Sequence, residues 1–126
     1  MADTNKQFDQ VTAKCRRIFI DKMQDYGPSW RIFRLHGITD QLYIKACNIR
    51  QRQESGVSLV GDDIEGNLRA IVNYGVTAII QSRNGYADAI DMTNERATQL
   101  YDEVLQEAKD LMLRKNHDYG EAWREM

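Results

Sequence analysis

The segment Phe8–Arg31 reads FDQVTAKCRRIFIDKMQDYGPSWR and decides the fold. Its apolar residues recur mostly at steps of three or four, which places them on one face of an α-helix. Asp3 and Thr4 are both candidates for the N-cap, and Gly27 followed by Pro28 is typical of a helix end. We therefore predict a first long helix between these points. Its apolar face carries Phe8, Val11, Cys15, Ile18, Phe19 and Met23.

The rest of the chain shows the same helical spacing, and no stretch has a convincing period of two. A single proline in 126 residues agrees with long, uninterrupted helices. The predicted fold is an all-α bundle of about four long helices with a short helical turn at Trp30–Leu35. The remaining long helices are predicted from Thr39, as N-cap, to Gly56, from Asp62 to about Arg83, and from about Asp91 to Gly120.

Composition narrows the class of protein. Seventeen basic against nineteen acidic residues give a formal net charge of −2, which disfavours general nucleic-acid binding because that affinity comes mostly from clustered cations. The mainly apolar stretch Val76–Ile80 is far too short to span a bilayer, and the N-terminus has no apolar signal core. Cys15 and Cys47 have neither metal nor redox spacing and both lie on apolar helical positions. We expect buried free thiols and a cytoplasmic protein without a membrane segment.

An internal duplication links the two ends of the chain. When the sequence is displaced by 93 residues, Phe8–Arg31 falls on Tyr101–Arg124, and eight of these 24 positions are identical. We therefore predict a complete first unit at residues 1–92 and the start of a second unit at 93–126, cut short at Met126. The identical pairs are Asp9/Asp102, Val11/Val104, Lys22/Lys115, Asp25/Asp118, Tyr26/Tyr119, Gly27/Gly120, Trp30/Trp123 and Arg31/Arg124.

The most complete repeated string admits two interpretations. In the structural one, the glycine ends a helix, the large aromatic residues pack in the core, and the acid pairs with a neighbouring cation. In the functional one, the cations contact phosphate oxygens while an aromatic ring stacks on a base. Repetition does not decide between them, because duplicated structure is duplicated too. The string comprises Lys22, Asp25, Tyr26, Gly27, Trp30 and Arg31.

Two further polar residues have the same double interpretation. Arg50 follows the apolar face of the predicted helix that ends at Gly56, so it is either solvated or a phosphate contact. Asn73 stands among apolar neighbours, where an amide either bonds across a helix interface or reaches a ligand.

An acidic cluster surrounds the predicted loop at residues 57–61. Carboxylates are the ligands that Mg²⁺ prefers, and two acids one turn apart at a helix start could face one cation. The competing interpretation is a capping box, in which Asp62 and Glu65 bond to the first turn of the helix. The predicted metal-binding set is Glu54, Asp62, Asp63 and Glu65.

The run DYGPSWR at residues 25–31, the run Thr39–Ala46, Arg50 and the pair Asn73-Tyr74 together resemble the nucleotide modification associated domain family, first type. The likeness covers about residues 7–82 and again 100–126. That family is distantly similar to the MazG-like all-α nucleotide pyrophosphohydrolases, which bind Mg²⁺ with acidic residues on two antiparallel helices. The resemblance implies nucleotide handling. The chain departs from the MazG-like pattern, because it lacks the paired acidic motifs and has Ala70 where an acid would be expected.

Three hypotheses follow. In the first, the chain is a Mg²⁺-dependent nucleotide pyrophosphohydrolase-like protein, in which the acidic set holds the metal, Lys22, Arg31 and Arg50 hold the phosphates, and Trp30 or Tyr26 holds the base. In the second, it is a noncatalytic helical sensor or interaction module, which the missing acidic pairs favour. In the third, it is a DNA-binding accessory, which the net charge disfavours. We also expect a homodimer with the last helix at or near the interface, because that helix heads a second unit that lacks its own partner helices.

Overall fold

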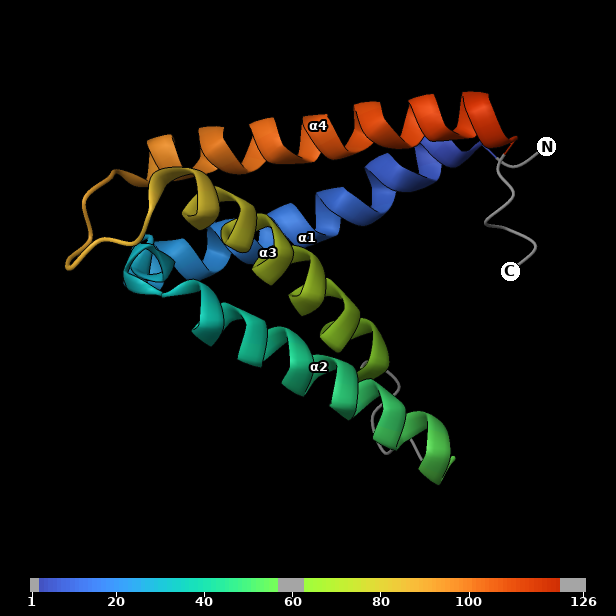
Figure 1. Cartoon of the computed structure of the whole chain (residues 1–126), viewed down its shortest axis with the longest axis horizontal. Coiled ribbons are helices and arrows are strands. Elements are labelled where there is room, and N and C mark those ends of the chain that lie inside the picture. The colour runs from blue at the N-terminus through green and yellow to red at the C-terminus, as the bar shows by residue number, and fades with distance from the viewer. Residues whose placement is uncertain (1–2, 57–62, 121–126) are drawn as a thin grey trace.

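A computed structural model describes residues 3–56 and 63–120 of the chain. Within these ranges every regular element is helical, which confirms the predicted all-α bundle (Figure 1). The elements in chain order are α1 (Thr4–Tyr26), the short 3₁₀-helix η1 (Ser29–Ile32), α2 (Leu35–Ser55), α3 (Asp63–Asn84) and α4 (Asn94–Tyr119).

Helix α1 begins and ends where the sequence predicts. The side chain of Asp3 caps the helix by accepting a hydrogen bond from the backbone N–H of Lys6 at 3.0 Å. At the other end Gly27 adopts a φ of 63°, and its N–H donates to the carbonyl of Met23 at 2.7 Å. A side chain at this position would be strained, so the glycine sets the helix end.

The starts of α2 and α4 differ from the predicted ones. Helix α2 begins at Leu35, and the hydroxyl of Thr39 donates back to the carbonyl of Leu35 at 2.9 Å instead of capping a new helix. The prediction was wrong because a threonine hydroxyl serves both bonding patterns. Helix α4 begins at Asn94 with Thr93 as its N-cap, later than the predicted Asp91. The predicted loop at 57–61 and Asp62 lie outside the described residues.

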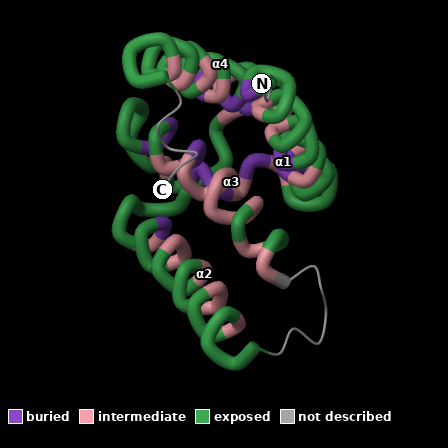
Figure 2. The backbone as a smooth tube through the Cα atoms, turned by 90° about the vertical axis from the view of Figure 1, so that its right-hand side faces the viewer, coloured by how far each residue is buried: buried purple, intermediate pink, exposed green. Residues whose placement is uncertain are grey.

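Helices α1 and α4 run antiparallel side by side, α3 packs across them, and α2 packs along α3 (Figure 1). The core lies where α1, α3 and α4 meet, and Figure 2 shows its buried residues there, while α2 is mostly exposed or half-buried. The ring of Phe19 stacks on Tyr101 at 4.3 Å between centroids and approaches Trp30 at 5.9 Å. The core cluster contains Phe19, Met23, Trp30, Val76, Ile80, Ala97, Tyr101 and Val104.

The paired helices α1 and α4 are related by a local twofold symmetry. Arg16 of α1 pairs with Asp102 of α4 at 2.7 Å, and Lys109 of α4 pairs with Asp9 of α1 at 2.9 Å. The 93-residue displacement aligns Asp9 with Asp102 and Arg16 with Lys109. The Arg16–Asp102 pair therefore corresponds to the Lys109–Asp9 pair when α1 and α4 exchange places. This exchange fits the predicted duplication, whose unit boundaries stay a prediction.

The two cysteines have different environments. Cys15 of α1 is fully buried, as predicted, whereas Cys47 of α2 is exposed. The prediction for Cys47 was wrong because α2 packs mainly on α3, so that apolar positions on its other side face solvent. No described helix is both long enough and apolar enough to cross a membrane.

Candidate functional site

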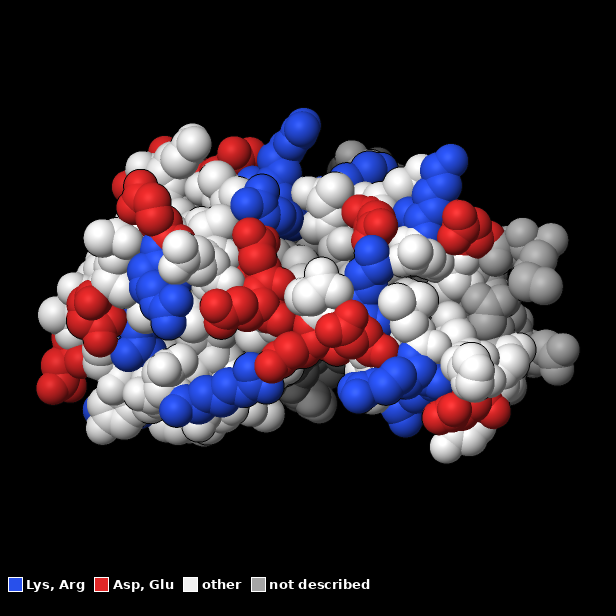
Figure 3. All heavy atoms as spheres, turned by 90° about the horizontal axis from the view of Figure 1, so that it is seen from above, with Lys and Arg blue, Asp and Glu red and all other residues white. Residues whose placement is uncertain are grey.

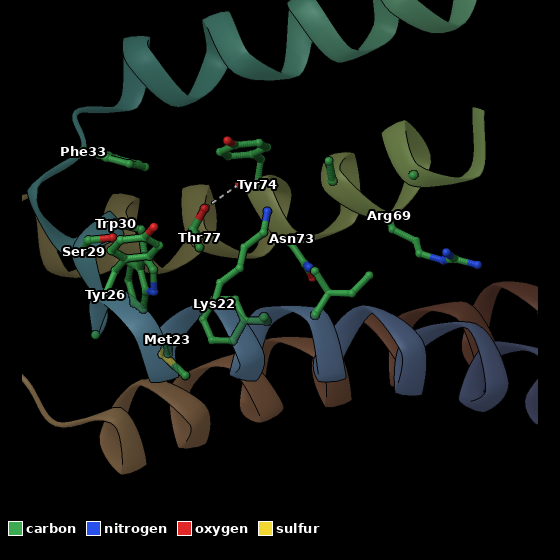
Figure 4. Close-up of a pocket in the computed structure, with 15 residues that line it drawn as sticks. Lys22, Met23, Tyr26, Ser29, Trp30, Phe33, Arg69, Asn73, Tyr74 and Thr77 are labelled. Carbon is green, nitrogen blue, oxygen red and sulfur yellow. Dashed lines mark hydrogen bonds between the residues drawn. The ribbon is translucent and has the colours of Figure 1, made fainter. Parts of the chain in front are cut away.

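A cavity of about 320 Å³ lies between α1, η1 and α3. Figure 4 shows the residues that line it, and four of the seven predicted ligand-binding residues are among them. Residues far apart in sequence meet here because Gly27 turns the chain from α1 into η1 beside α3. The four predicted residues that the structure brings together are Lys22, Tyr26, Trp30 and Asn73.

One end of the cavity is aromatic. Tyr26, Trp30 and Phe33 lie at the η1 end of the cavity, and Tyr74 lines its α3 side (Figure 4). Trp30 is 7% exposed, and its indole Nε1 is buried without a hydrogen-bond partner among the described residues. Tyr26 is 74% exposed and therefore forms the rim. An aromatic wall of this kind suits a planar ligand.

The cavity also has cationic side chains. Lys22 extends from α1 toward Asn73 and Tyr74 of α3, and it forms no ion pair with any described residue (Figure 4). Arg69 stands at the edge of the cavity, where its guanidinium donates to Glu65 at 3.0 Å. Lys22 is therefore the described cation that is available to an anionic ligand inside the cavity.

Asn73 serves the core as well as the cavity. Its amide Nδ2 donates to the carbonyl of Cys15 at 3.0 Å, and its Oδ1 accepts from the hydroxyl of Tyr101 at 2.6 Å. Burial raises the pKa of Tyr101, which keeps this hydroxyl protonated as a donor. The first of the two predicted interpretations, an amide bonded across a helix interface, therefore describes Asn73.

Arg31, a predicted phosphate contact, lies outside the cavity lining. It is 4% exposed, and its guanidinium donates to Gln81, to the carbonyl of Gly85 at 2.7 Å and to both carboxylate oxygens of Asp91. Hydrogen bonds from Arg31 lower the pKa of Asp91. These contacts hold η1 against the end of α3 and the segment before α4, so they support the structural interpretation for this residue.

The other predicted residues do not converge on the cavity. Asp25 is exposed and lies outside the lining. Arg50 and Glu54 form an exposed ion pair at 3.8 Å near the end of α2, and Glu65 pairs with Arg69. The side chains of Asp62 and Asp63 fall outside the described structure.

The predicted magnesium set stays a prediction, because the side chains of Asp62 and Asp63 lie outside the described structure. No group of three or more His, Cys, Asp or Glu side chains that could hold a metal ion occurs among the described residues. Glu54 and Glu65 already pair with arginines, which offset the carboxylate charge that Mg²⁺ would need.

Sequence reasoning missed part of the lining. Phe33, Arg69, Tyr74 and Thr77 line the cavity, and the hydroxyl of Thr77 donates to the carbonyl of Tyr74 at 3.0 Å (Figure 4). Helical spacing would have indicated the α3 residues, because Arg69 and Thr77 are each one helical turn from Asn73 and lie on the same face. Phe33 offered no such signal.

The molecular surface is mixed in charge. On the face seen from above α4, acidic and basic side chains are interspersed (Figure 3). Ion pairs of opposite sign such as Arg83–Glu107, at 2.8 Å, contribute to this mixture.

Comparison with known families gives a match. Residues 22–82 match the family model described as nucleotide modification associated domain 1, which confirms the resemblance over that range. The matched range ends before α4, so the second stretch of the predicted resemblance stays a prediction. Comparisons with curated proteins and with solved structures give no match.

Proposed function

We propose that this chain binds a nucleotide, or another small phosphorylated ligand, in the cavity between α1, η1 and α3. The match of residues 22–82 to nucleotide modification associated domain 1 supports the ligand class. All lining residues except Ile18 and Phe19 fall within the matched range. The family match therefore covers nearly the whole lining of this cavity.

The observation that carries the proposal is the combination of Trp30 and Lys22 in one cavity. The ring of Trp30 lies in the wall of the cavity, where an aromatic face can stack on a planar base. Lys22 offers a positive charge beside this wall, on the same helix as Tyr26. A heteroaromatic base at the aromatic end and a phosphate at Lys22 satisfy both groups.

The size of the cavity limits how much ligand it encloses. About 320 Å³ is near the lower end of the roughly 300–1,000 Å³ typical of small-molecule sites. We expect the base and the first phosphate to lie within the cavity. Further phosphates would extend along α3 toward Arg69, at its edge.

Our proposal is binding without an assigned chemical step. Ala70 lines the cavity at the position where the MazG-like resemblance expects an acidic residue, so this wall supplies no carboxylate there. The alternative is a Mg²⁺-dependent nucleotide pyrophosphohydrolase-like protein, and it rests on Glu54, Asp62, Asp63 and Glu65. A nonenzymatic sensor or interaction module agrees better with the two exposed arginine-paired glutamates.

Calorimetric titration of nucleoside mono- and triphosphates, with and without Mg²⁺, tests the proposal. We expect saturable binding that Lys22→Met weakens about tenfold or more, because a charge-assisted phosphate contact is lost. Trp30→Phe should weaken binding several-fold, since the smaller ring leaves less aromatic area to stack on the base. Lys6→Met, about 24 Å away along the same helix, is the matched control and should have no effect.

The proposal fails if no nucleotide gives a saturable signal, or if Lys6→Met weakens binding as much as Lys22→Met. Pyrophosphate release in the same samples separates the alternatives. Binding without release supports the sensor, whereas release that depends on Mg²⁺ supports the pyrophosphohydrolase-like hypothesis.

We also propose an oligomeric state and a cellular location for the chain. The first half of α4 packs on its own chain through Ala97, Tyr101 and Val104, so a homodimer would use the exposed face of the second half that carries Leu113. The mass of the protein in solution, measured by light scattering, tests this.

We propose that the protein is located in the cytoplasm, because its two free cysteines fit a reducing compartment.

A further inference from the structure

A second hollow, of about 640 Å³, lies between the first half of α1 and the second half of α4. Helix α3 does not reach it, because α3 crosses the α1–α4 pair over the end where α1 stops and α4 starts (Figure 1). We call this hollow the terminal groove. Its apolar lining consists of Phe8, Val11, Ala108, Leu111 and Met112, with Thr4, Gln7, Lys115 and Asn116 also in the lining.

The terminal groove is the symmetry mate of the surface that α3 covers. The 93-residue displacement converts Phe8 into Tyr101, Val11 into Val104, Cys15 into Ala108 and Phe19 into Met112. Tyr101, Val104, Cys15 and Phe19 are all 5% exposed or less. In that half of the molecule, α3 supplies Val76 and Ile80 to the core, and Asn73 bonds to the carbonyl of Cys15 and to the hydroxyl of Tyr101.

We infer that the terminal groove binds a second amphipathic helix of the α3 type. The local twofold that exchanges the Arg16–Asp102 and Lys109–Asp9 ion pairs places such a helix over Phe8, Val11 and Met112. This inference does not depend on the proposed nucleotide site, which lies under α3 at the other end of the pair.

The differences between the two halves specify the chemistry of the partner helix. Phe8 has no hydroxyl where Tyr101 has one, so the partner residue equivalent to Asn73 needs a donor for the carbonyl of Ala108 and no acceptor.

Continuity with an existing interface favours a helix over a second copy of the whole chain. Val11 lines the terminal groove and also the adjacent hollow beside Leu68 and Arg69 of α3. A helix docked in the groove would therefore lie next to α3 and cover Val11 and Leu68, which are 56% and 50% exposed. A second copy of the chain would bring only its own terminal groove to this groove, because the α3 helix of that copy is already packed in its own core.

A labelled synthetic peptide with the sequence of residues 63–84, the α3 segment, is the probe. Fluorescence anisotropy with the full chain should show saturable one-to-one binding. Leu111→Glu, in the groove, should weaken binding about tenfold or more, because a charge replaces an apolar contact. Leu113→Glu is the matched control: it is on the same helix, similarly exposed and outside the groove, and it should change affinity less than about twofold.

Val11→Glu on the opposite wall provides a second test and should also weaken binding. Circular dichroism confirms that each variant stays folded, and all three positions are exposed enough to accept a charge. Absence of saturable binding, or equal losses in Leu111→Glu and Leu113→Glu, overturns the inference. It is also overturned if light scattering shows a wild-type dimer that Leu111→Glu converts to a monomer, because a second copy then fills the groove.

Discussion

Arg31 of η1 and Asp91 of the α3–α4 connection form a two-pronged ion pair across 60 residues of sequence, with Nε–Oδ1 and Nη2–Oδ2 distances of 2.9 and 3.2 Å. The backbone of Arg31 takes part in the same junction, since its carbonyl accepts from Gln81 at 2.9 Å and from the N–H of Ala87 at 2.8 Å. Trp30 precedes Arg31 in η1, so this junction also fixes the aromatic wall of the proposed site.

Removing the guanidinium of Arg31 should therefore destabilise the whole fold. We expect Arg31→Met to lower the free energy of unfolding by about 2–4 kcal/mol, because buried acceptors on Gln81 and Gly85 lose their donor. Arg83→Met, which breaks the exposed pair with Glu107, is the control and should cost less than about 1 kcal/mol. Chemical denaturation measures both. Similar losses in the two variants would contradict a structural role for Arg31.

Asp91 should give the fold an acid-sensitive component. Arg31 lowers the pKa of this carboxyl in the folded state, so its contribution to stability is present above its unfolded pKa of about 4 and is lost as pH falls through the lower folded pKa. Asp91→Asn should therefore be less stable than wild type at pH 7, and the difference should shrink as the pH falls below the unfolded pKa of about 4. Melting temperatures at pH 7 and in acid test this. A difference that stays constant or grows in acid would exclude the linkage.

The contacts of Arg31 show which features of the fold sequence patterns predict and which they do not. Helical spacing and the Gly27 end signal predicted α1, because both are local properties of a few consecutive residues. The partners of Arg31 could not be predicted, because Gln81, Gly85 and Asp91 are at least 50 residues away and no periodicity connects them to η1. Arg31 was therefore open to a phosphate-binding interpretation that its buried contacts do not favour.

The candidate site was partly predictable for the same reason. Lys22, Tyr26 and Trp30 belong to one repeated string, and a helix followed by a tight turn keeps them together. Phe33 and Tyr74 join them through packing of η1 and α3, which depends on tertiary contacts. The predicted start of α2 was wrong for a local reason, because the hydroxyl of Thr39 bonds within its own helix.

The hydroxyl of Tyr101 should stabilise the contact between α3 and α4. Tyr101→Phe leaves Oδ1 of Asn73 without this donor and should cost about 1–2 kcal/mol. Asn73→Ala should cost more, because the bond to the carbonyl of Cys15 is lost as well. The double variant should then be less destabilised than the sum of the two single losses, since both remove the same bond. Full additivity in denaturation experiments would show that the two side chains are not coupled.

The two thiols should react at very different rates. Cys15 is fully buried, and burial raises its pKa, so both access and the thiolate form are restricted. Cys47 is exposed on α2. An aromatic disulfide reagent at pH 8 should therefore modify one thiol per folded chain rapidly, and a second one only when the chain unfolds. Cys47→Ser should remove the rapid phase, whereas Cys15→Ala should leave it intact. Two equally fast thiols in the native protein would mean that α1 opens readily from α3 and α4, and that the core containing Phe19 and Tyr101 is not closed over Cys15.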